Sequence, residues 1–345
     1  MPLYRKRLIL TVRNNLRAFL SFEAGATRGG VTDSAGQLER AWRRIEEQER
    51  RIQSLTAGGG EDVASGSVRA ENLVWIFSSG RSGTTWLRDM MSGVEGYSAW
   101  EEPLVGQMFG DYYFNISPNK RAARNYILGE PHKPVWLSAI RKLVLDGAIA
   151  RFPERLDGGF VVIKEPNGSH GAPVLSEALP ESRVLTVVRD PRDVCASSID
   201  GKKEGGWQYK NRRDAAWSKQ RLADNKPEEF IRRLAKHCTR HMNGAVEAYR
   251  SHEGPKSLIK YEDLIADTLG IMRGVYRDLE LPASDEALAR TVEKHAWENI
   301  PEEKKGKGKF YRKGESGGWK EDLTPRQVEI VEEETGHLIK EFYEE

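Results

Sequence analysis

Residues 73–91 read LVWIFSSGRSGTTWLRDMM. Leu73 to Phe77 form an apolar run without alternation, which is typical of a β-strand buried on both faces. Residues 78–83 are small and glycine-rich, and residues 84–91 place apolar side chains at helical spacing. We therefore predict a buried strand, a tight turn and the start of a helix. Backbone N–H groups converge at such a turn and the helix dipole adds partial positive charge, so the stretch predicts a pocket for an anion.

The side chains of this turn narrow the kind of anion. Thr84 and Thr85 stand where the helix should start, and we expect their hydroxyls to cap it and to contact a bound phosphate. The stretch does not fit the phosphate-binding loop GxxxxGK[ST], because Arg81 lies inside the turn and no lysine precedes Thr84. A magnesium-bound nucleoside triphosphate held in the usual way is therefore not expected. A glycine turn before a core helix is the alternative interpretation.

Length and composition bound the class of protein. The 345 residues can hold one large α/β domain or two smaller ones, and 38% hydrophobic residues suffice for a core. The net charge of +2 does not favour nucleic-acid binding. Two cysteines, Cys195 and Cys238, provide no disulfide framework, which suits a reducing compartment, and we expect a cytoplasmic location. The sequence contains no apolar run of about 18 residues, so we predict no membrane span.

The first 67 residues are expected to form an N-terminal helical extension and a linker. Within Leu38–Leu55, apolar residues recur at a spacing of seven, a short heptad pattern. This helix could pair two copies of the chain into a homodimer, or it could be a solvated helix with one apolar stripe. Residues 56–67 are rich in glycine, alanine and serine and are typical of a flexible linker. We place the boundary there, with the main domain over residues 68–345.

Three further segments predict strands. Residues 160–163 and 184–188 are apolar runs, and residues 258–264 are typical of a strand that leads into a helix. The fold class expected is α/β, with a P-loop-like parallel sheet flanked by helices. Lys164 follows the first of these strands, and open α/β sheets keep ligands at the carboxyl ends of their strands.

Two more segments carry residues suited to a phosphate. Arg189 ends a predicted strand and Ser197 lies two turns into the next predicted helix, where Asp190 and Pro191 suit the cap and first turn. A structural Arg–Asp pair at a strand–helix junction is the alternative. Glycines alternate with cations over residues 304–320, so backbone N–H groups and side chains could close on an anion together, although a solvated basic loop is the simpler interpretation. Thr324 and Gln327 then predict a capping box for a final helix.

Glu101 and Glu102 are candidates for proton transfer. They precede Pro103, which disfavours helix at Glu102 and favours an extended, exposed loop, with the two side chains on opposite sides. One short helix separates them from the predicted anion turn, so a return to the same cleft is geometrically plausible. Solvated surface acids are the alternative.

Taken together, these segments resemble sulfotransferases that use 3′-phosphoadenosine 5′-phosphosulfate (PAPS). Gly80–Trp86 matches the family's 5′-phosphosulfate loop with arginine in place of lysine, and residues 189–197 resemble its 3′-phosphate motif RDPRDVxxS. Residues 312–320 match RKGxxGxWK, the second 3′-phosphate motif, and residues 295–299 resemble the segment over the adenine. The resemblance implies transfer of a sulfuryl group from PAPS to a hydroxyl or amine of an acceptor such as a glycan, lipid or small molecule.

The resemblance also implies roles for single residues. Glu102, with Glu101 as the second candidate, would be the base, as in the tyrosylprotein branch. The cytosolic branch has Lys-Thr-His after its strand where this chain has Pro166 in place of the histidine, and His170 is a fallback. Arg81 and Lys164 would face the bridging phosphate oxygen of the departing nucleotide. The residues expected to bind the nucleotide are Gly80, Arg81, Ser82, Gly83, Thr84, Thr85, Trp86, Arg189, Ser197, Tyr261, Arg312, Lys313 and Gly314.

Two other functions stay open at this point. One is a non-catalytic nucleotide- or anion-binding module, and the other is a kinase with a degenerate P-loop, which would require Mg²⁺ and ATP. No metal-binding constellation is expected, because the site supplies its own cations. The residues between the motifs determine which acceptor is used, and their sequence pattern does not identify it.

Overall fold

The computed structural model describes residues 68–155, 158–203, 205–208 and 227–344. They belong to the second of two compact units, Met1–Asp62 and Val63–Glu345. The predicted helix Leu38–Leu55 and the linker after it lie outside the described residues.

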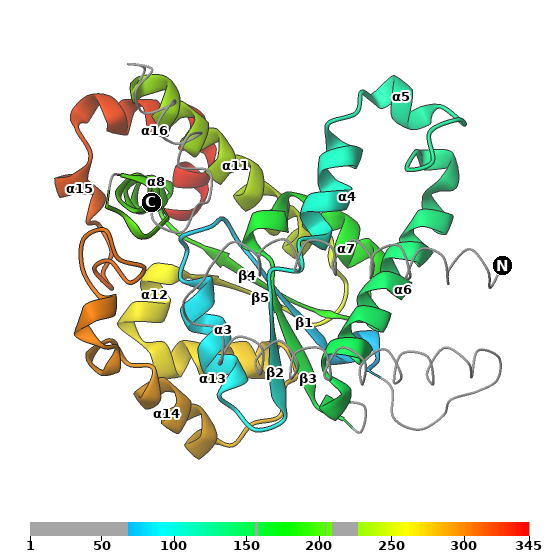
Figure 1. The fold of residues 1–345 in the computed structure, drawn as a ribbon, viewed down its shortest axis with the longest axis horizontal. Helices are drawn as coiled ribbons and strands as arrows, with labels where there is room; N and C mark the ends of the chain where they lie inside the picture. Colours follow the sequence, from blue (N-terminus) through cyan, green and yellow to red (C-terminus); the bar gives the residue numbers. More distant parts are fainter. Residues whose placement is uncertain (1–67, 156–157, 204, 209–226, 345) are drawn as a thin grey trace, which may run out of the picture. The chain divides into compact units, whose positions relative to one another are not determined.

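The centre of the domain is a five-stranded sheet in which all strands run parallel (Figure 1). The strand order is β2-β3-β1-β4-β5, so β1 is the middle strand. This architecture confirms the predicted α/β class. The strands are β1 (Leu73–Phe77), β2 (Tyr97–Glu101), β3 (Phe160–Lys164), β4 (Arg183–Val188) and β5 (Lys256–Lys260).

Strand β2 is a correction to the sequence analysis. The prediction of an exposed loop at Glu101 is wrong. Residues 97–101 form a strand that pairs with β3 along its whole length, from Tyr97 opposite Phe160 to Glu101 opposite Lys164. The sequence hid this edge strand because its residues do not form a buried apolar run: only Tyr97 is fully buried. The pairing places Glu101 beside Lys164.

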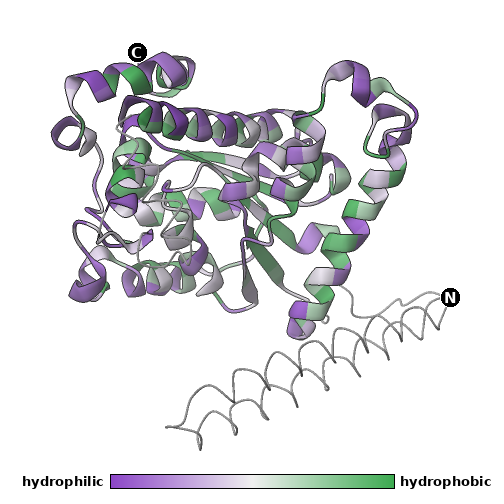
Figure 2. Ribbon diagram, turned by 45° about the horizontal axis from the view of Figure 1, so that its top comes forward, coloured by the Kyte–Doolittle hydropathy of each residue, from purple (hydrophilic) through white to green (hydrophobic). Residues whose placement is uncertain are grey.

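Successive residues of β1 face opposite layers, and all five are buried. Leu73, Trp75 and Phe77 pack in one cluster with apolar residues of α6 (Lys133–Arg151), α7 (Ala172–Ala178) and α11 (Pro227–Ser251). Val74 and Ile76 pack in another cluster. Its helices are α3 (Thr84–Ser92), α12 (Tyr261–Ala266), α13 (Thr268–Asp278) and α14 (Asp285–Lys294). Figure 2 shows the apolar strands between these helices, so burial on both faces is confirmed.

The remaining elements surround the carboxyl ends of the strands or connect the layers. The helices are α4 (Val105–Phe114), α5 (Pro118–Ala122), α8 (Pro191–Lys202), α15 (Trp319–Asp322) and α16 (Pro325–Phe342). The 3₁₀ turns are η1 (Ala70–Asn72), η2 (Glu130–His132), η3 (Pro153–Arg155), η4 (Pro166–Gly171), η5 (Trp297–Asn299) and η6 (Glu302–Lys304). None of the described helices has the length and apolarity that a membrane crossing requires.

The helix starts test three predicted caps. The Asp190 side chain accepts from the backbone N–H of Arg192, and Thr324 and Gln327 form a capping box at the start of α16, so both predictions are confirmed. The predicted threonine cap of α3 is wrong. Gly83 is its N-cap residue, with φ of 78°, and no side chain caps the helix. A left-handed residue is needed where the turn closes onto the helix, and glycine adopts it without strain.

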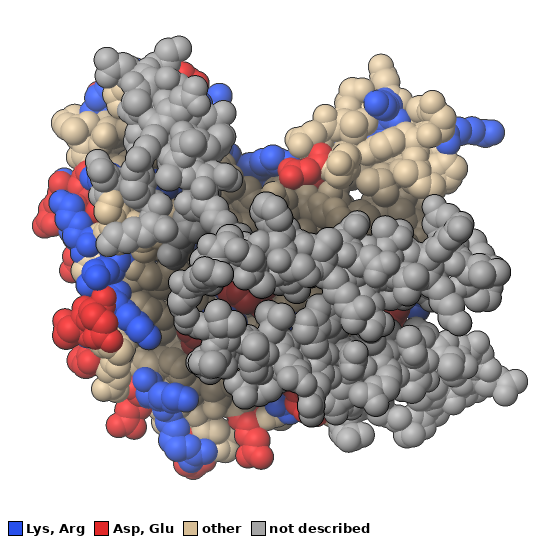
Figure 3. All heavy atoms as spheres, in the orientation of Figure 1, with Lys and Arg blue, Asp and Glu red and all other residues tan. Residues whose placement is uncertain are grey.

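Positive and negative side chains are interspersed along the left edge of the face in Figure 3. This mixture agrees with the small net charge of the chain. Charges of both signs on one surface also give many of the exposed ion pairs, such as Arg326 with Glu228. Such exposed pairs contribute little to stability.

Two buried histidines join η4 to α11. His170 Nδ1 lies 3.2 Å from His241 Nε2, and His170 Nε2 lies 3.0 Å from a carboxylate oxygen of Asp111 on α4. Burial, followed by the charges of Arg240 and His241, lowers the pKa of His170 to about 4. Burial also lowers the pKa of His241. The neutral form of this pair therefore belongs to the folded state.

We expect the His170 pair to make the fold acid-sensitive. The unfolded chain binds a proton at His170 near pH 6.5 and the folded chain only near pH 4, so the free energy of unfolding should fall, by up to about 3 kcal/mol, as the pH falls through that window. In His170→Gln the difference between pH 7 and pH 4.5 should shrink, measured by urea unfolding. His337→Gln removes an exposed histidine and should behave like the parent chain. Equal differences in all three proteins would contradict this account.

Candidate active site

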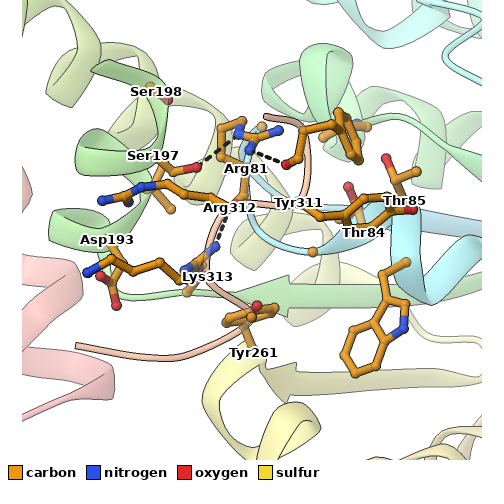
Figure 4. A pocket seen from close by; sticks show the side chains of 18 of the residues that line it. Arg81, Thr84, Thr85, Asp193, Ser197, Ser198, Tyr261, Tyr311, Arg312 and Lys313 are labelled. Atoms are coloured by element: carbon orange, nitrogen blue, oxygen red, sulfur yellow. Dashed lines mark hydrogen bonds between the residues drawn. The ribbon is translucent and has the colours of Figure 1, made fainter. Parts of the chain in front are cut away.

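A cavity of about 380 Å³ lies at the carboxyl ends of β1, β3 and β4 (Figure 4). Strand order changes direction beside β1, the position where open α/β sheets bind ligands. Every predicted site residue lines this cavity except Glu101, Ser82 and the fallback base His170. Those that line it are Gly80, Arg81, Gly83, Thr84, Thr85, Trp86, Glu102, Lys164, Arg189, Ser197, Tyr261, Arg312, Lys313 and Gly314.

The turn between β1 and α3 is anchored from three sides. Ser78 donates through Oγ to the carbonyl of Val187 at 2.7 Å, and its N–H donates to Ser169 Oγ at 2.9 Å. Gly83 lies against Tyr261, where an added Cβ would stand 2.6 Å from the ring. Ser82 is fully buried with its hydroxyl 3.2 Å from Ser79 Oγ, so the structure places it inside the turn instead of on the cavity wall.

Three arginines converge on one side of the cavity. Arg81 donates from Nε to Ser197 Oγ at 3.1 Å and from Nη2 to the carbonyl of Phe310 at 2.8 Å. Arg189 donates to the carbonyl of Arg81 at 2.9 Å, while its buried Nε has no hydrogen-bond partner among the described residues. Burial, followed by the charges of Arg189 and Arg312, lowers the pKa of Arg81 to about 10. These cations repel one another, so a bound anion would relieve both the repulsion and the unpaired donor.

Carboxylates hold the basic loop of residues 305–318 against α8. Asp193 accepts from the backbone N–H of Gly317 at 2.7 Å and of Trp319 at 2.9 Å. Asp200 accepts from the N–H of Gly308 at 2.6 Å. The loop is therefore held against α8, and two of its cationic side chains, Arg312 and Lys313, line the cavity.

Within that loop, Arg312 pairs with Asp322 and Lys313 Nζ lies 2.9 Å from Glu321. Gly314 has φ of 66° and packs on Trp297, where an added Cβ would stand 2.5 Å from the ring. Glycine is therefore required at this position by both conformation and space.

Apolar and aromatic groups line another wall of the cavity. The indole N–H of Trp86 donates to the carbonyl of His295 at 2.7 Å, and Trp297 lines the same cavity. Sequence reasoning missed Ile265, Thr268 and Val292, which also line it. Nothing in the sequence separates them from ordinary core positions of a helix.

Lys164 is the centre of the acidic part of the site. Its Nζ lies 2.7 Å from both Glu101 Oε1 and Glu102 Oε1, and it donates to Thr85 Oγ1 at 3.1 Å. The lysine side chain is only 5% exposed. The expected placement of the two glutamates on opposite sides is wrong, because Glu102 adopts φ of 40° and both carboxylates turn to the same ammonium.

The two glutamates nevertheless differ in their surroundings. Glu101 also pairs with Arg88, is 47% exposed and does not line the cavity. Glu102 is 25% exposed, lines the cavity and accepts from the side-chain amide of Asn167. Asn167 was missed in the sequence, where no signal marks it. His170 does not line the cavity.

In the described ranges, no cluster of three or more histidine, cysteine, aspartate or glutamate side chains is arranged to hold a metal ion.

Solved structures with a similar fold include several sulfotransferases. A mouse sulfotransferase complexed with PAP is 14% identical over 80% of this chain and 86% of its own, with a TM-score of 0.48. The sulfotransferase domain from the curacin biosynthetic pathway is 16% identical over 79% and 98%, with a TM-score of 0.45. A sulfotransferase from Mycobacterium avium is 16% identical over 81% and 78%, with a TM-score of 0.45.

Sequence comparison gives the family. Among curated proteins no significant match was found. Residues 171–342, about half of the chain, match the model of the family described as "Sulfotransferase domain". The match contains both segments with predicted 3′-phosphate motifs, Arg189–Ser197 and Arg312–Gly314, and it begins after the turn that follows β1. With this match the chain belongs to the sulfotransferase family.

Proposed function

We propose that this protein transfers a sulfuryl group from PAPS to a hydroxyl or amine of an acceptor such as a glycan, a lipid or a small molecule. The observation that carries the proposal is the cavity itself. It combines three converging arginines with a lysine–glutamate pair on its wall, and the buried Nε of Arg189 has no hydrogen-bond partner in the part of the chain that the structure describes. The first group suits a polyanionic donor and the second suits proton transfer.

The residues present fit the donor nucleotide. Arg189, Ser197 and residues 312–314 would hold the 3′-phosphate, since they supply cationic and hydroxyl donors at one end of the cavity. The N–H groups at the start of α3 would hold the 5′-phosphosulfate. Trp86 and Trp297 offer aromatic faces for the adenine. Arg81 remains our candidate for charge neutralisation at the departing nucleotide, although its guanidinium contacts Ser197 and Phe310 here.

The acidic part of the site would take up the proton that the acceptor loses. Bound PAPS supplies the sulfuryl group, and PAP (adenosine 3′,5′-bisphosphate) leaves as the product. Glu102 accepts the proton of the acceptor as the acceptor oxygen or nitrogen bonds to sulfur. Lys164 stabilises the carboxylate before transfer and the negative charge that develops on the departing phosphate.

The proposal also covers the location of the protein, its oligomeric state and the role of its N-terminal residues. Cys195 and Cys238 are both buried free thiols, which supports a cytoplasmic location. A homodimer through Leu38–Leu55 stays a prediction. We also keep residues 1–67 as an extension that contributes no residue to the reaction.

The reaction is tested by incubating the full chain and PAPS with a metabolite pool in excess chelator. We expect PAPS-dependent products heavier by one SO₃ group, found by mass spectrometry, because the site supplies its own cations. A kinase would instead require Mg²⁺ and ATP. Binding of PAP without any turnover would favour the non-catalytic module.

The nucleotide site should distinguish a nucleotide that carries a 3′-phosphate from one that lacks it. PAP should bind more tightly than 5′-AMP, and Lys313→Ala should weaken PAP binding on the order of tenfold while changing AMP binding little, because one charge-assisted contact is lost. Isothermal calorimetry measures both. Lys309→Ala is the matched control, since Lys309 belongs to the same loop, is exposed and does not line the cavity. Equal affinities of the parent chain for PAP and AMP would refute the assignment.

The two glutamates should differ in catalysis. Glu102→Gln should keep PAP affinity but lose about a hundredfold or more in single-turnover rate at saturating PAPS, because its general base is removed. Glu101→Gln should lose much less, since Glu101 does not line the cavity. The opposite ranking would assign the base to Glu101, and near-normal rates in both variants would exclude both.

A further inference from the structure

Glu165 is a buried acid that the reaction does not use. It follows Lys164 at the end of β3, has no exposed surface and does not line the cavity. Burial raises the pKa of Glu165 to about 7, even though two backbone N–H groups stabilise the carboxylate. Burying a carboxylate costs free energy unless hydrogen bonds compensate for its lost hydration, so the partners of Glu165 indicate its structural role.

Its two carboxylate oxygens bond the segment that follows Glu102. Oε2 accepts from the N–H of Leu104 at 3.0 Å, and Oε1 accepts from the N–H of Gly106 at 3.1 Å. Leu104 is the N-cap of α4, where backbone N–H groups lack partners inside the helix. One side chain from β3 therefore fixes the start of α4.

The neighbouring contacts leave room only for small residues. An added Cβ on Gly106 would lie 2.4 Å from the carbonyl oxygen of Gly168, and one on Gly168 would lie 2.3 Å from Glu165 Oε1. Helix α4 thus approaches η4 at backbone contact distance. The carboxylate of Glu165 lies at this junction.

The turn between Glu102 and α4 is strained. Glu102 has φ of 40° and Leu104 has φ of 60°, and both are left-handed conformations that are uncommon for residues with a side chain. The backbone N–H of Glu102 donates to the carbonyl of Lys164 at 2.9 Å, which fixes the entry to the turn. Glu165 fixes the exit. Without both anchors, the turn would relax and carry the Glu102 side chain with it.

We propose that Glu165 is a positioning residue for Glu102: its carboxylate holds the backbone at Leu104 and Gly106, and thereby keeps the Glu102 carboxylate on Lys164 and Asn167 at the cavity. The proposal rests on the function proposed above, in which Glu102 is the base. It requires both oxygens of Glu165. A glutamine accepts through one oxygen only and would turn an N–H₂ group toward the second backbone donor.

A double-mutant cycle separates positioning from general damage. Glu165→Gln should lower the single-turnover rate at least tenfold at saturating PAPS and acceptor, with the affinity for PAP within twofold of the parent. Glu165→Gln combined with Glu102→Gln should be no slower than Glu102→Gln alone. The two hydrogen bonds that Glu165 accepts from the backbone of Leu104 and Gly106, here called the Glu165 clamp, affect the rate only by positioning Glu102, and the double variant has already lost that base. Losses that multiply, or a normal rate in Glu165→Gln, would overturn the proposal. The control is Glu181→Gln, an exposed glutamate near the start of β4.

Two further measurements cover the other outcomes. If Glu165→Gln does not fold, Pro103→Gly decides, because it loosens the same turn without altering a buried charge. It should also lower turnover and preserve PAP affinity, and a normal rate would overturn the proposal. Hydrogen exchange at the amides of Leu104 and Gly106 reads the clamp without turnover and should accelerate at least tenfold in Glu165→Gln. An inactive parent chain would refute the proposed function alone, and unchanged exchange would refute the clamp.

Discussion

The ammonium of Lys164 is the contact on which the catalytic geometry depends. It joins the end of β2 through Glu101, the turn after β2 through Glu102 and the start of α3 through Thr85. Removing this buried cation would leave Glu102 without its ion pair and Glu101 with Arg88 alone, so the turn after β2 would lose its side-chain contact with this edge of the sheet. The same ammonium is therefore both the structural centre of this edge of the sheet and the candidate catalytic cation.

The cavity divides into two regions of different charge. Arg81, Arg189 and Arg312 occupy the region next to α8 and the loop of residues 305–318, and within the described ranges the Nε of Arg189 has no hydrogen-bond partner. Glu102, Lys164 and Asn167 occupy the region at the end of β3. This separation suits sulfuryl transfer, because the donor nucleotide needs concentrated positive charge and the acceptor needs a base.

Support for the second region comes from residues that do not contact the cavity. Glu165 bonds the start of α4, and the buried pair His170–His241 links η4 to α11. The α4–η4–α11 junction thus contains several groups whose ionisation is opposed by burial. Groups of this kind give a junction a defined geometry, at the expense of sensitivity to pH.

The sequence by itself determined the strand–turn–helix at residues 73–91, the α/β class and the segments predicted to bind the nucleotide, because each depends on residues that are close along the chain. Tertiary structure alone decided the rest. Arg81 meets Ser197 across 116 positions of sequence, and Lys164 draws Glu101 and Glu102 to one side, against the expected alternation. Glu165 and Asn167 have no local pattern at all. Their roles come from long-range contacts, which a pattern of neighbouring residues does not encode.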